Sequence, residues 1–463
     1  MSSKNKESTQ QPQRQVVIIG GVAAGMSCAA KLGREAPETS ITVFEQGEHI
    51  SYGACGLPYY VGDVIEDYQK LIVKTPDDFE DTNITVKTRH QVLAVFPSEK
   101  KVLVKNLEAQ DNEKDTFHQP YNQLVITTGA APTLPPFAKG APGNVFTLRD
   151  INDGLLMKNA ALQPTVTDVV ILGSGYIGME MVEAFHSLGK KVRVINRSDR
   201  LMKTFDPEIR ELVRKELEDK NIALSFNQQV EALLADDEGM VRAVKTDQNE
   251  YPAQLVVVAT GVRPSTEFLE GTGINTLKNG AIVIDEKMRT NLDGIYAAGD
   301  CASLWHRQLK QPVHIPLATY ANRQGRLLGE ILAGKDVSFP GGIGASMVKI
   351  LDITLSQAGL SETQAKEAKL NYKTSFIKGY SHAGYYPGST PLYIKYIFDP
   401  ETQVLLGAQL AGEKGAALRI DALSIAIDQG LTLNQLAYSD FAYTPPYSGA
   451  WDPLQIAANV AMP

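Results

Sequence analysis

The hydrophobic pattern near the N-terminus predicts a strand, a glycine turn and a helix. Residues 16–19 are continuously apolar, as in a buried strand, and they lead into Gly20. An alanine-rich helical stretch then runs to about Arg34. The next apolar run, residues 41–45, ends in an acid, Glu45. This order of elements predicts a β-α-β unit.

The same order recurs from residue 169. Residues 169–172 are apolar and lead into a second glycine turn, residues 173–178, which reads Gly-Ser-Gly-Tyr-Ile-Gly. A helical stretch and a predicted strand, residues 191–195, follow. Two more apolar runs, 124–129 and 256–261, each end in a glycine with a proline soon after, which stops the strand. The chain therefore carries two units of the dinucleotide-binding type.

The pattern changes after about residue 340, where strand-like segments precede helical ones. This predicts a separate α+β domain with an antiparallel sheet, on a fold that is α/β with two Rossmann-like domains before it. The strands are expected near 346–356, 371–378, 392–398 and 404–411, and the helices near 415–429 and 433–437. The expected boundaries are 1–14 for a disordered tail, 15–150 with 266–335 for the first domain, 151–265 for the second and 340–463 for the third.

Composition and charge narrow the class of partner. The net charge is −8 and no dense block of Lys and Arg appears, so nucleic acid is not an expected partner. No apolar run approaches the ~20 residues of a membrane helix, and the polar N-terminus lacks the core of a signal peptide. The three cysteines, Cys28, Cys55 and Cys301, form no CxxC pair and no Cys/His cluster. Free thiols, a cytoplasmic location and no metal site are therefore expected.

The first glycine turn predicts a nucleotide site. Backbone amides at a helix N-terminus can bind a pyrophosphate, and an acid at the end of the next strand can bind a ribose hydroxyl. Gly20, Gly25 and Glu45 occupy these positions, although Val22 replaces the middle glycine. The apolar segment 295–300 ends in Asp300, where a carboxylate can hydrogen-bond the ribityl chain of a flavin.

The second turn has all three glycines, Gly173, Gly175 and Gly178. The acid is missing here, because the strand end reads Asn-Arg-Ser at 196–198. A carboxylate would repel a 2′-phosphate, whereas Arg197 can bind one. The second site is therefore expected to favour NADPH, with NADH possible.

Cys55 lies in the loop 51–59, just after the strand that bears Glu45. In a doubly wound domain this places the loop beside the nucleotide crevice. A helix N-terminus at this point would lower the pKa of the thiol. Because no cysteine lies nearby, Cys55 would cycle as a mixed disulfide, a persulfide or a sulfenate. Cys28 and Cys301 are expected to be structural.

With these motifs, the chain resembles the pyridine nucleotide-disulfide oxidoreductase superfamily from about residue 15 to 460. It looks most like the single-cysteine branch, which contains coenzyme A-disulfide reductases, NAD(P)H oxidases and peroxidases, and persulfide or polysulfide reductases. The motifs that carry the resemblance are Gly20-Gly21-Val22-Ala23-Ala24-Gly25, the Cys55 loop, Thr128-Gly129-Ala130, the segment from Gly173 to Glu180, and Ala298-Gly299-Asp300-Cys301.

The resemblance implies FAD in the first domain, NAD(P)H in the second and a homodimer formed by the third. It implies that Tyr176 gates the nicotinamide and that Glu180 holds it against the flavin. The cofactor-binding residues implied are Gly20, Ala24, Gly25, Glu45, Thr128, Gly129, Asp300, Gly173, Gly175, Tyr176, Gly178, Glu180, Arg197 and Gly261.

Differences within the branch indicate the substrate. Oxidases and peroxidases usually carry a histidine in the first glycine turn, and this chain has none there. Two C-terminal tyrosines of coenzyme A-disulfide reductases are thought to approach the cysteine from the partner subunit, and Tyr385 and Tyr443 match them. Tyr386 and Tyr447 are expected to pack at the dimer interface. Ala54 stands where these reductases often have Asn, which leaves the identity of the disulfide open.

The predicted function is therefore the NAD(P)H-dependent reduction of a small-molecule disulfide, coenzyme A disulfide first, through Cys55. Tyr443, with Tyr385, would protonate or position the leaving thiolate. The alternatives are an NAD(P)H oxidase or peroxidase, a persulfide or polysulfide reductase, and a flavin-bearing redox sensor without turnover. The substrate-binding residues expected for coenzyme A disulfide are Ser51 and three cations for the phosphates, Lys31, Arg34 and Lys74.

Overall fold

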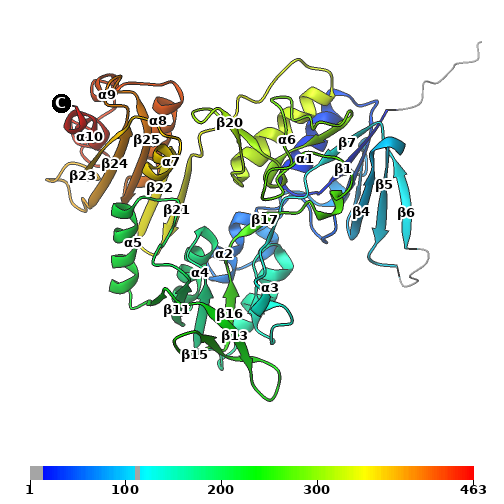
Figure 1. The fold of residues 1–463 in the computed structure, drawn as a ribbon, viewed down its shortest axis with the longest axis horizontal. Helices are drawn as coiled ribbons and strands as arrows, with labels where there is room; N and C mark the ends of the chain where they lie inside the picture. The colour runs from blue at the N-terminus through cyan, green and yellow to red at the C-terminus, as the bar shows by residue number, and fades with distance from the viewer. Residues whose placement is uncertain (1–13, 110–114, 463) are drawn as a thin grey trace, which may run out of the picture.

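The computed structural model describes residues 14–109 and 115–462. It contains three domains, each built on a five-stranded sheet (Figure 1). The predicted disordered tail, residues 1–14, lies outside the described residues except for Arg14. The α/β prediction, with two parallel sheets and a C-terminal antiparallel one, is confirmed.

The first sheet is parallel and takes its last strand from far along the chain. Strand β1 lies at its centre, and β18 adds to the outer side of β7, which brings Asp300 to the sheet. Helices α1 (Ala23–Glu35) and α6 (Ala318–Leu332) cross in close contact. The helices are so near that a Cβ on Gly325 would lie 2.2 Å from the Ala24 carbonyl oxygen. The strand order is β18 (Ile295–Ala297), β7 (Gln123–Ile126), β1 (Gln15–Ile19), β2 (Ser40–Phe44) and β3 (Ile84–Lys87).

The second sheet is also parallel and repeats the arrangement. Strand β10 lies at its centre, followed by the turn to α4 (Tyr176–Ser187), and α5 (Pro207–Asp219) precedes the edge strand. Strand β9 pairs with β16 in this sheet, so the second unit begins before the boundary expected at residue 150. The order is β12 (Ala223–Phe226), β11 (Lys191–Asn196), β10 (Asp168–Leu172), β16 (Leu255–Val258) and β9 (Val145–Phe146).

The third sheet is antiparallel, as expected, but the predicted strand 346–356 is a hairpin. The chain reverses at Leu351, whose φ of 55° ends β21 and allows β22 to pair back along it. Helices α7 (Glu362–Glu367) and α10 (Pro453–Ala461) were not anticipated. The order is β21 (Ser346–Ile350), β22 (Ile353–Gly359), β25 (Leu405–Gly412), β24 (Pro391–Phe398) and β23 (Lys373–Tyr380), with α8 (Ala416–Asp428) and α9 (Leu433–Ala437) as expected.

Smaller elements complete the chain. Two short helices, α2 (Leu57–Val61) and α3 (Ile151–Ala161), pack against each other between the first two domains. The small sheets are β4 (His90–Phe96), β5 (Lys101–Asn106) and β6 (Thr116–Pro120); β13 (Val230–Ala235), β14 (Val241–Thr246) and β15 (Glu250–Pro252); β8 (Ala130–Pro132) with β17 (Val262–Pro264); and β19 (Leu304–His306) with β20 (Gln311–Val313).

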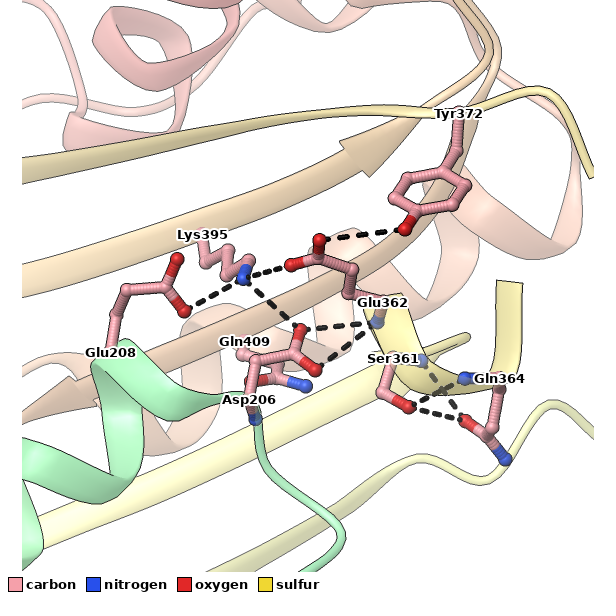
Figure 2. Close-up of polar contacts among 8 residues, drawn as sticks. All are labelled: Asp206, Glu208, Ser361, Glu362, Gln364, Tyr372, Lys395 and Gln409. Carbon is pink, nitrogen blue, oxygen red and sulfur yellow. Dashed lines mark hydrogen bonds and ion pairs between the residues drawn. The ribbon is translucent and has the colours of Figure 1, made fainter. Parts of the chain in front are cut away.

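A buried ion cluster joins the second domain to the third (Figure 2). Lys395 of β24 is fully buried, and its ammonium lies 2.7 Å from Glu208, 2.8 Å from Glu362 and 3.5 Å from Asp206. The Asp206 carboxylate also accepts hydrogen bonds from the Glu362 amide at the start of α7. The Asp206 amide donates to Gln409 of β25, 2.9 Å away. The loop before α5 is therefore fixed to the third domain by polar contacts at several atoms.

Lys395→Met should destabilise the protein by about 3 kcal/mol, because it leaves the buried Asp206 carboxylate without a counter-ion. Lys366→Met, at an exposed position of α7, is the matched control and should change stability by no more than about 0.5 kcal/mol. Thermal unfolding followed by circular dichroism measures both. Equal midpoints for the two variants would show that the cluster contributes nothing to stability.

Candidate active site

The first glycine turn has room for backbone only. Gly20 has φ +102°, and a Cβ there would lie 2.3 Å from the Thr127 carbonyl oxygen. A Cβ on Gly25 would lie 1.8 Å from the Gly20 carbonyl oxygen. Ala24 is buried and packs toward Gly299, at the end of β18. The turn is thereby pressed against the ends of β7 and β18.

Glu45 is fixed at the end of β2 by two backbone amides. One carboxylate oxygen accepts from Gly21 and the other from Gly47, both at 2.7 Å. The predicted ribose-binding acid thus lies at the first turn, with its orientation set by the turn itself. A carboxylate held in this way retains further lone pairs for a hydroxyl donor.

Asp300 presents an unsatisfied acceptor. Its Oδ1 atom is buried and has no hydrogen-bond partner among the described residues. Burial raises the pKa of the carboxyl, and His314 acts in the opposite direction. A buried carboxylate oxygen without a donor is costly, so a hydroxyl from a bound group would satisfy it. Together with the first turn and Glu45, this oxygen fits the ribityl chain of FAD.

The other residues expected at the flavin differ in their partners. Thr128 donates its hydroxyl hydrogen to the Ser265 carbonyl at 2.7 Å. Gly129 has φ +67° and Gly261 has φ +132°, and each faces open space where a Cβ would point. These two glycines follow β7 and β16, the strands next to the centres of their sheets.

The three glycines of the second turn differ in their surroundings. A Cβ on Gly173 would lie 2.4 Å from the Ala259 carbonyl oxygen, and one on Gly178 would lie 2.3 Å from the Gly173 carbonyl oxygen. A Cβ on Gly175 would meet nothing within 4 Å. Gly173 and Gly178 are therefore required by the fold, and Gly175 leaves the α4 N-terminus accessible to a ligand.

Arg197 is exposed at the end of β11 and forms no ion pair with any described residue. The Asn196 side chain donates to the carbonyl groups of Ser198 and Arg200, which orders the turn after the strand. A guanidinium on an ordered turn at this position can bind a phosphate.

Tyr176 and Glu180 lie one turn apart on α4. The Tyr176 hydroxyl is hydrogen-bonded to Ser346 at 2.9 Å and accepts from Gln357 at 3.1 Å. Burial raises the pKa of Glu180 to about 7, with a further contribution from Glu183. Glu180 therefore exists in both protonation states near neutral pH.

Cys55 is the exposed cysteine, and Cys28 and Cys301 are buried, as expected for structural residues. Its loop is tied to the first turn, since the Ser51 amide donates to the Gly21 carbonyl at 2.9 Å. The expectation of a lowered thiol pKa is wrong for this structure. Desolvation first, and then the carboxylates of Glu180 and Asp300, raise the pKa of Cys55. The helix that follows, α2, has only five residues and does not outweigh these effects.

Tyr59 was not singled out from the sequence. It lines a small hollow with Glu180, between α2 and α4, and burial together with the charges of Glu180 and Glu183 raises its pKa. A tyrosine in a loop near a cysteine carries no distinguishing sequence signal. Only the packing of α2 on α4 brings the two side chains to one place.

Tyr385 and Tyr443 are brought together by the third domain. Their hydroxyl oxygens lie 2.7 Å apart, and both side chains are exposed. The hydrogen bond to Tyr443 raises the pKa of Tyr385. Tyr386 packs edge-on against His382, and Tyr447 is exposed.

The three predicted phosphate-binding cations differ in availability. Lys31 is buried between Glu35 and Glu330, at 2.6 Å and 2.9 Å, so its charge is already neutralised. Lys74 pairs with Asp78 at 2.8 Å. Arg34 is exposed and has no ion pair with any described residue. Arg34 is thus the cation of the three that remains available.

The described ranges, 14–109 and 115–462, contain neither a candidate metal site nor a candidate membrane span. No group of three or more His, Cys, Asp and Glu side chains within them is placed to bind a metal ion. None of their helices is long and apolar enough to cross a membrane.

Comparison with known proteins supports a single assignment. The chain matches the pyridine nucleotide-disulphide oxidoreductase profile over residues 14–325 and the dimerisation domain of that family over residues 345–454. It is 36% identical over 450 residues to the NAD(P)H sulfur oxidoreductase (CoA-dependent) of Pyrococcus furiosus, covering 97% of this chain and 99% of the relative. Coenzyme A disulfide reductase of Staphylococcus aureus is 32% identical, with 94% and 96% covered. The solved NAD-dependent persulfide reductase from A. fulgidus superposes with a TM-score of 0.91 at 36% identity, covering 96% of this chain and 82% of that one.

Gly175→Ala should leave thermal stability unchanged and weaken the binding of NADP⁺ about tenfold, because its Cβ occupies only the space open to a ligand. Gly178→Ala should instead lower the unfolding midpoint, because its Cβ meets the Gly173 carbonyl. Thermal unfolding and calorimetric titration separate the two effects. If Gly175→Ala bound NADP⁺ as well as the unmodified chain, the second turn would not be the nucleotide site.

Proposed function

Because the chain belongs to the pyridine nucleotide-disulphide oxidoreductase family, we propose that it reduces a small disulfide, coenzyme A disulfide first, through Cys55. The family binds FAD and NAD(P)H, and the protein is an NAD(P)H-dependent flavoprotein oxidoreductase. The observation that carries the proposal is the position of Cys55. It is the exposed cysteine, on a loop bonded to the first glycine turn, and the other two cysteines are buried.

The flavin supplies two-electron transfer between reduced nicotinamide and sulfur. The residues that would hold it are those of the first glycine turn with Glu45, Thr128, Gly129 and Asp300. Glu45 would accept from a ribose hydroxyl, and the unpartnered Oδ1 of Asp300 would accept from the ribityl chain. Gly261, after β16, would let a bound nucleotide come close to the backbone, because no side chain occupies the open space there.

The sulfur chemistry balances with one cysteine. The Cys55 thiolate attacks one sulfur of the disulfide, which forms a mixed disulfide and releases one thiolate. Two electrons from NAD(P)H then restore the Cys55 thiolate and release the second. Each leaving thiolate takes up a proton, and the paired hydroxyls of Tyr385 and Tyr443 in the partner subunit are the proposed donors. Neutral Glu180, favoured below a pH of about 7, removes one charge that opposes the Cys55 thiolate.

The dimerisation domain implies a homodimer, and the surface of the third domain supports it. Large apolar side chains are exposed in the single chain on α8 (Leu418 and Ile425), on α10 (Ile456 and Val460) and just before α10 (Trp451). Exposed apolar surface of this kind is typical of a face that another chain covers.

Coenzyme A as the thiol is supported by the relatives. One is named coenzyme A disulfide reductase and another is named CoA-dependent. Ser51 would contact the substrate beside Cys55, and Arg34 is the available cation for its phosphates, with Lys74 and Lys31 contributing less because carboxylates already pair with them. A coenzyme A persulfide is the second candidate, because two of the similar proteins are named for sulfur or persulfide reduction.

NADPH is the proposed electron donor, with NADH as the alternative. Arg197 is exposed at the end of β11 and forms no ion pair with any described residue, and the strand ends in Asn196 where a carboxylate would repel a 2′-phosphate. The relatives do not decide the preference, since two carry NAD(P)H or NAD in their names.

NADPH oxidation without oxygen should depend on added coenzyme A disulfide and should be lost in Cys55→Ser. The reason is that serine cannot form the mixed disulfide. Absorbance at the nicotinamide band measures turnover, and parallel runs with NADH and with coenzyme A persulfide give the donor and the preferred sulfur species.

Cys28→Ala is the matched control, because it removes a buried sulfur on α1 and should keep full turnover. Turnover that appears only when oxygen or peroxide is admitted would identify an oxidase or peroxidase instead. A reduced flavin that no small oxidant discharges would identify a redox sensor.

A further inference from the structure

Tyr176 begins α4 but is bonded to the third domain. Its hydroxyl lies 2.9 Å from Ser346 of β21 and 3.1 Å from Gln357 of β22, and these two are 3.3 Å apart. Ser346 and Gln357 face each other in the register of the hairpin, so they lie on the same side of the sheet. We call these three residues the Tyr176 cluster.

The ring of Tyr176 is also held from the side of the second domain. It packs against Phe205, with ring centroids 6.4 Å apart. Phe205 lies in the loop between β11 and α5, next to Asp206, and that loop is fixed to Lys395 and to the start of α7 (Figure 2). The third domain therefore constrains both the hydroxyl and the ring of Tyr176.

The Tyr176 cluster lies at the start of α4, the helix that runs from the second glycine turn to the hollow beside the Cys55 loop. Tyr176 directly follows Gly175, the glycine that leaves the α4 N-terminus open. One turn along α4, Glu180 lines the hollow shared with Tyr59 of the Cys55 loop. A movement of the Tyr176 side chain would thus change the space beside the open glycine of the second turn.

We infer that Ser346 and Gln357 are positioning residues that hold Tyr176 in a closed conformation, which a bound nicotinamide must displace. This rests on the proposal that NADPH or NADH binds at the second glycine turn. Displacing the ring breaks the hydrogen bonds from the third domain, so the apparent affinity for the nucleotide is reduced by the fraction of closed molecules. The third domain would by this route set the nucleotide affinity of the second.

A purely structural role predicts something different. If the hydrogen bonds only satisfied a buried hydroxyl, their removal would lower stability and leave nucleotide binding unchanged. If they hold the closed conformation, their removal raises the open fraction and tightens binding. The two roles are therefore separated by a binding constant measured without turnover.

The experiment uses the FAD-loaded dimer and a tetrahydro derivative of NADPH, which binds but cannot donate hydride. Isothermal titration calorimetry compares the unmodified protein, Tyr176→Phe and the double variant Ser346→Ala with Gln357→Leu. We expect Kd to fall about threefold to tenfold in each, since each loses the hydrogen bonds between Tyr176 and the third domain. Combining all three substitutions should lower Kd no further than either set alone, because they remove one interaction.

Met347→Ala is the matched control. Met347 neighbours Ser346 on β21, is exposed and points to the other side of the sheet, so its Kd should equal that of the unmodified protein. Unchanged or weaker binding in the double variant would overturn the inference. A triple variant whose change in binding free energy equals the sum of the changes in Tyr176→Phe and the double variant would also overturn it. The same titration with the corresponding NADH derivative covers the alternative donor. If the unmodified protein bound neither derivative, the proposed nucleotide site and the proposed function would both be wrong. The other outcomes test the role of Ser346 and Gln357 alone.

Discussion

The close packing of each glycine turn against the end of a neighbouring strand, and of each following helix against its own turn, is the constraint on which the site depends. At Gly25 and Gly178 a single added carbon would overlap a backbone oxygen, so each helix begins within contact distance of its sheet. This contact fixes where the α1 and α4 N-termini lie, and Gly175 leaves space for a ligand at the α4 N-terminus. The Cys55 loop is positioned by the same feature, because the Ser51 amide bonds to Gly21 in the first turn.

The third domain does more than carry a dimer surface. Its Lys395 cluster fixes the loop before α5, and its hairpin holds the Tyr176 hydroxyl. Both contacts reach the second domain on the side where α4 and the loop after β11 meet. The affinity for NADPH or NADH and the packing between these domains are therefore linked in this account. In the proposed dimer, the exposed pair Tyr385 and Tyr443 would bring the same domain to the sulfur of the partner subunit.

Local patterns in the sequence predicted the elements that local physics determines. The strand–turn–helix order around Gly20 and Gly173 was sufficient for both nucleotide units, and Cys55 was identifiable by its loop. The hairpin at Leu351 was missed because residues 346–356 contain no Gly or Pro where the chain reverses, and Leu351 itself adopts the positive φ. The thiol pKa was assigned the wrong direction, because desolvation of Cys55 and the carboxylates of Glu180 and Asp300, both distant in sequence, outweigh a short helix. The pairing of Lys31 with Glu330 and the Tyr176 cluster likewise join segments that no sequence spacing connects.

The most direct test of the account is the intact mass of the protein after exposure to coenzyme A disulfide without NADPH. The account predicts one coenzyme A thiolate added per chain, attached at Cys55 by peptide mapping and removed when NADPH is admitted. Cys28 and Cys301 should stay unmodified, because both thiols are buried and desolvation raises their pKa to about 12 and about 11. An adduct on either buried cysteine, or an adduct at Cys55 that NADPH does not release, would contradict the assignment of Cys55 as the redox sulfur.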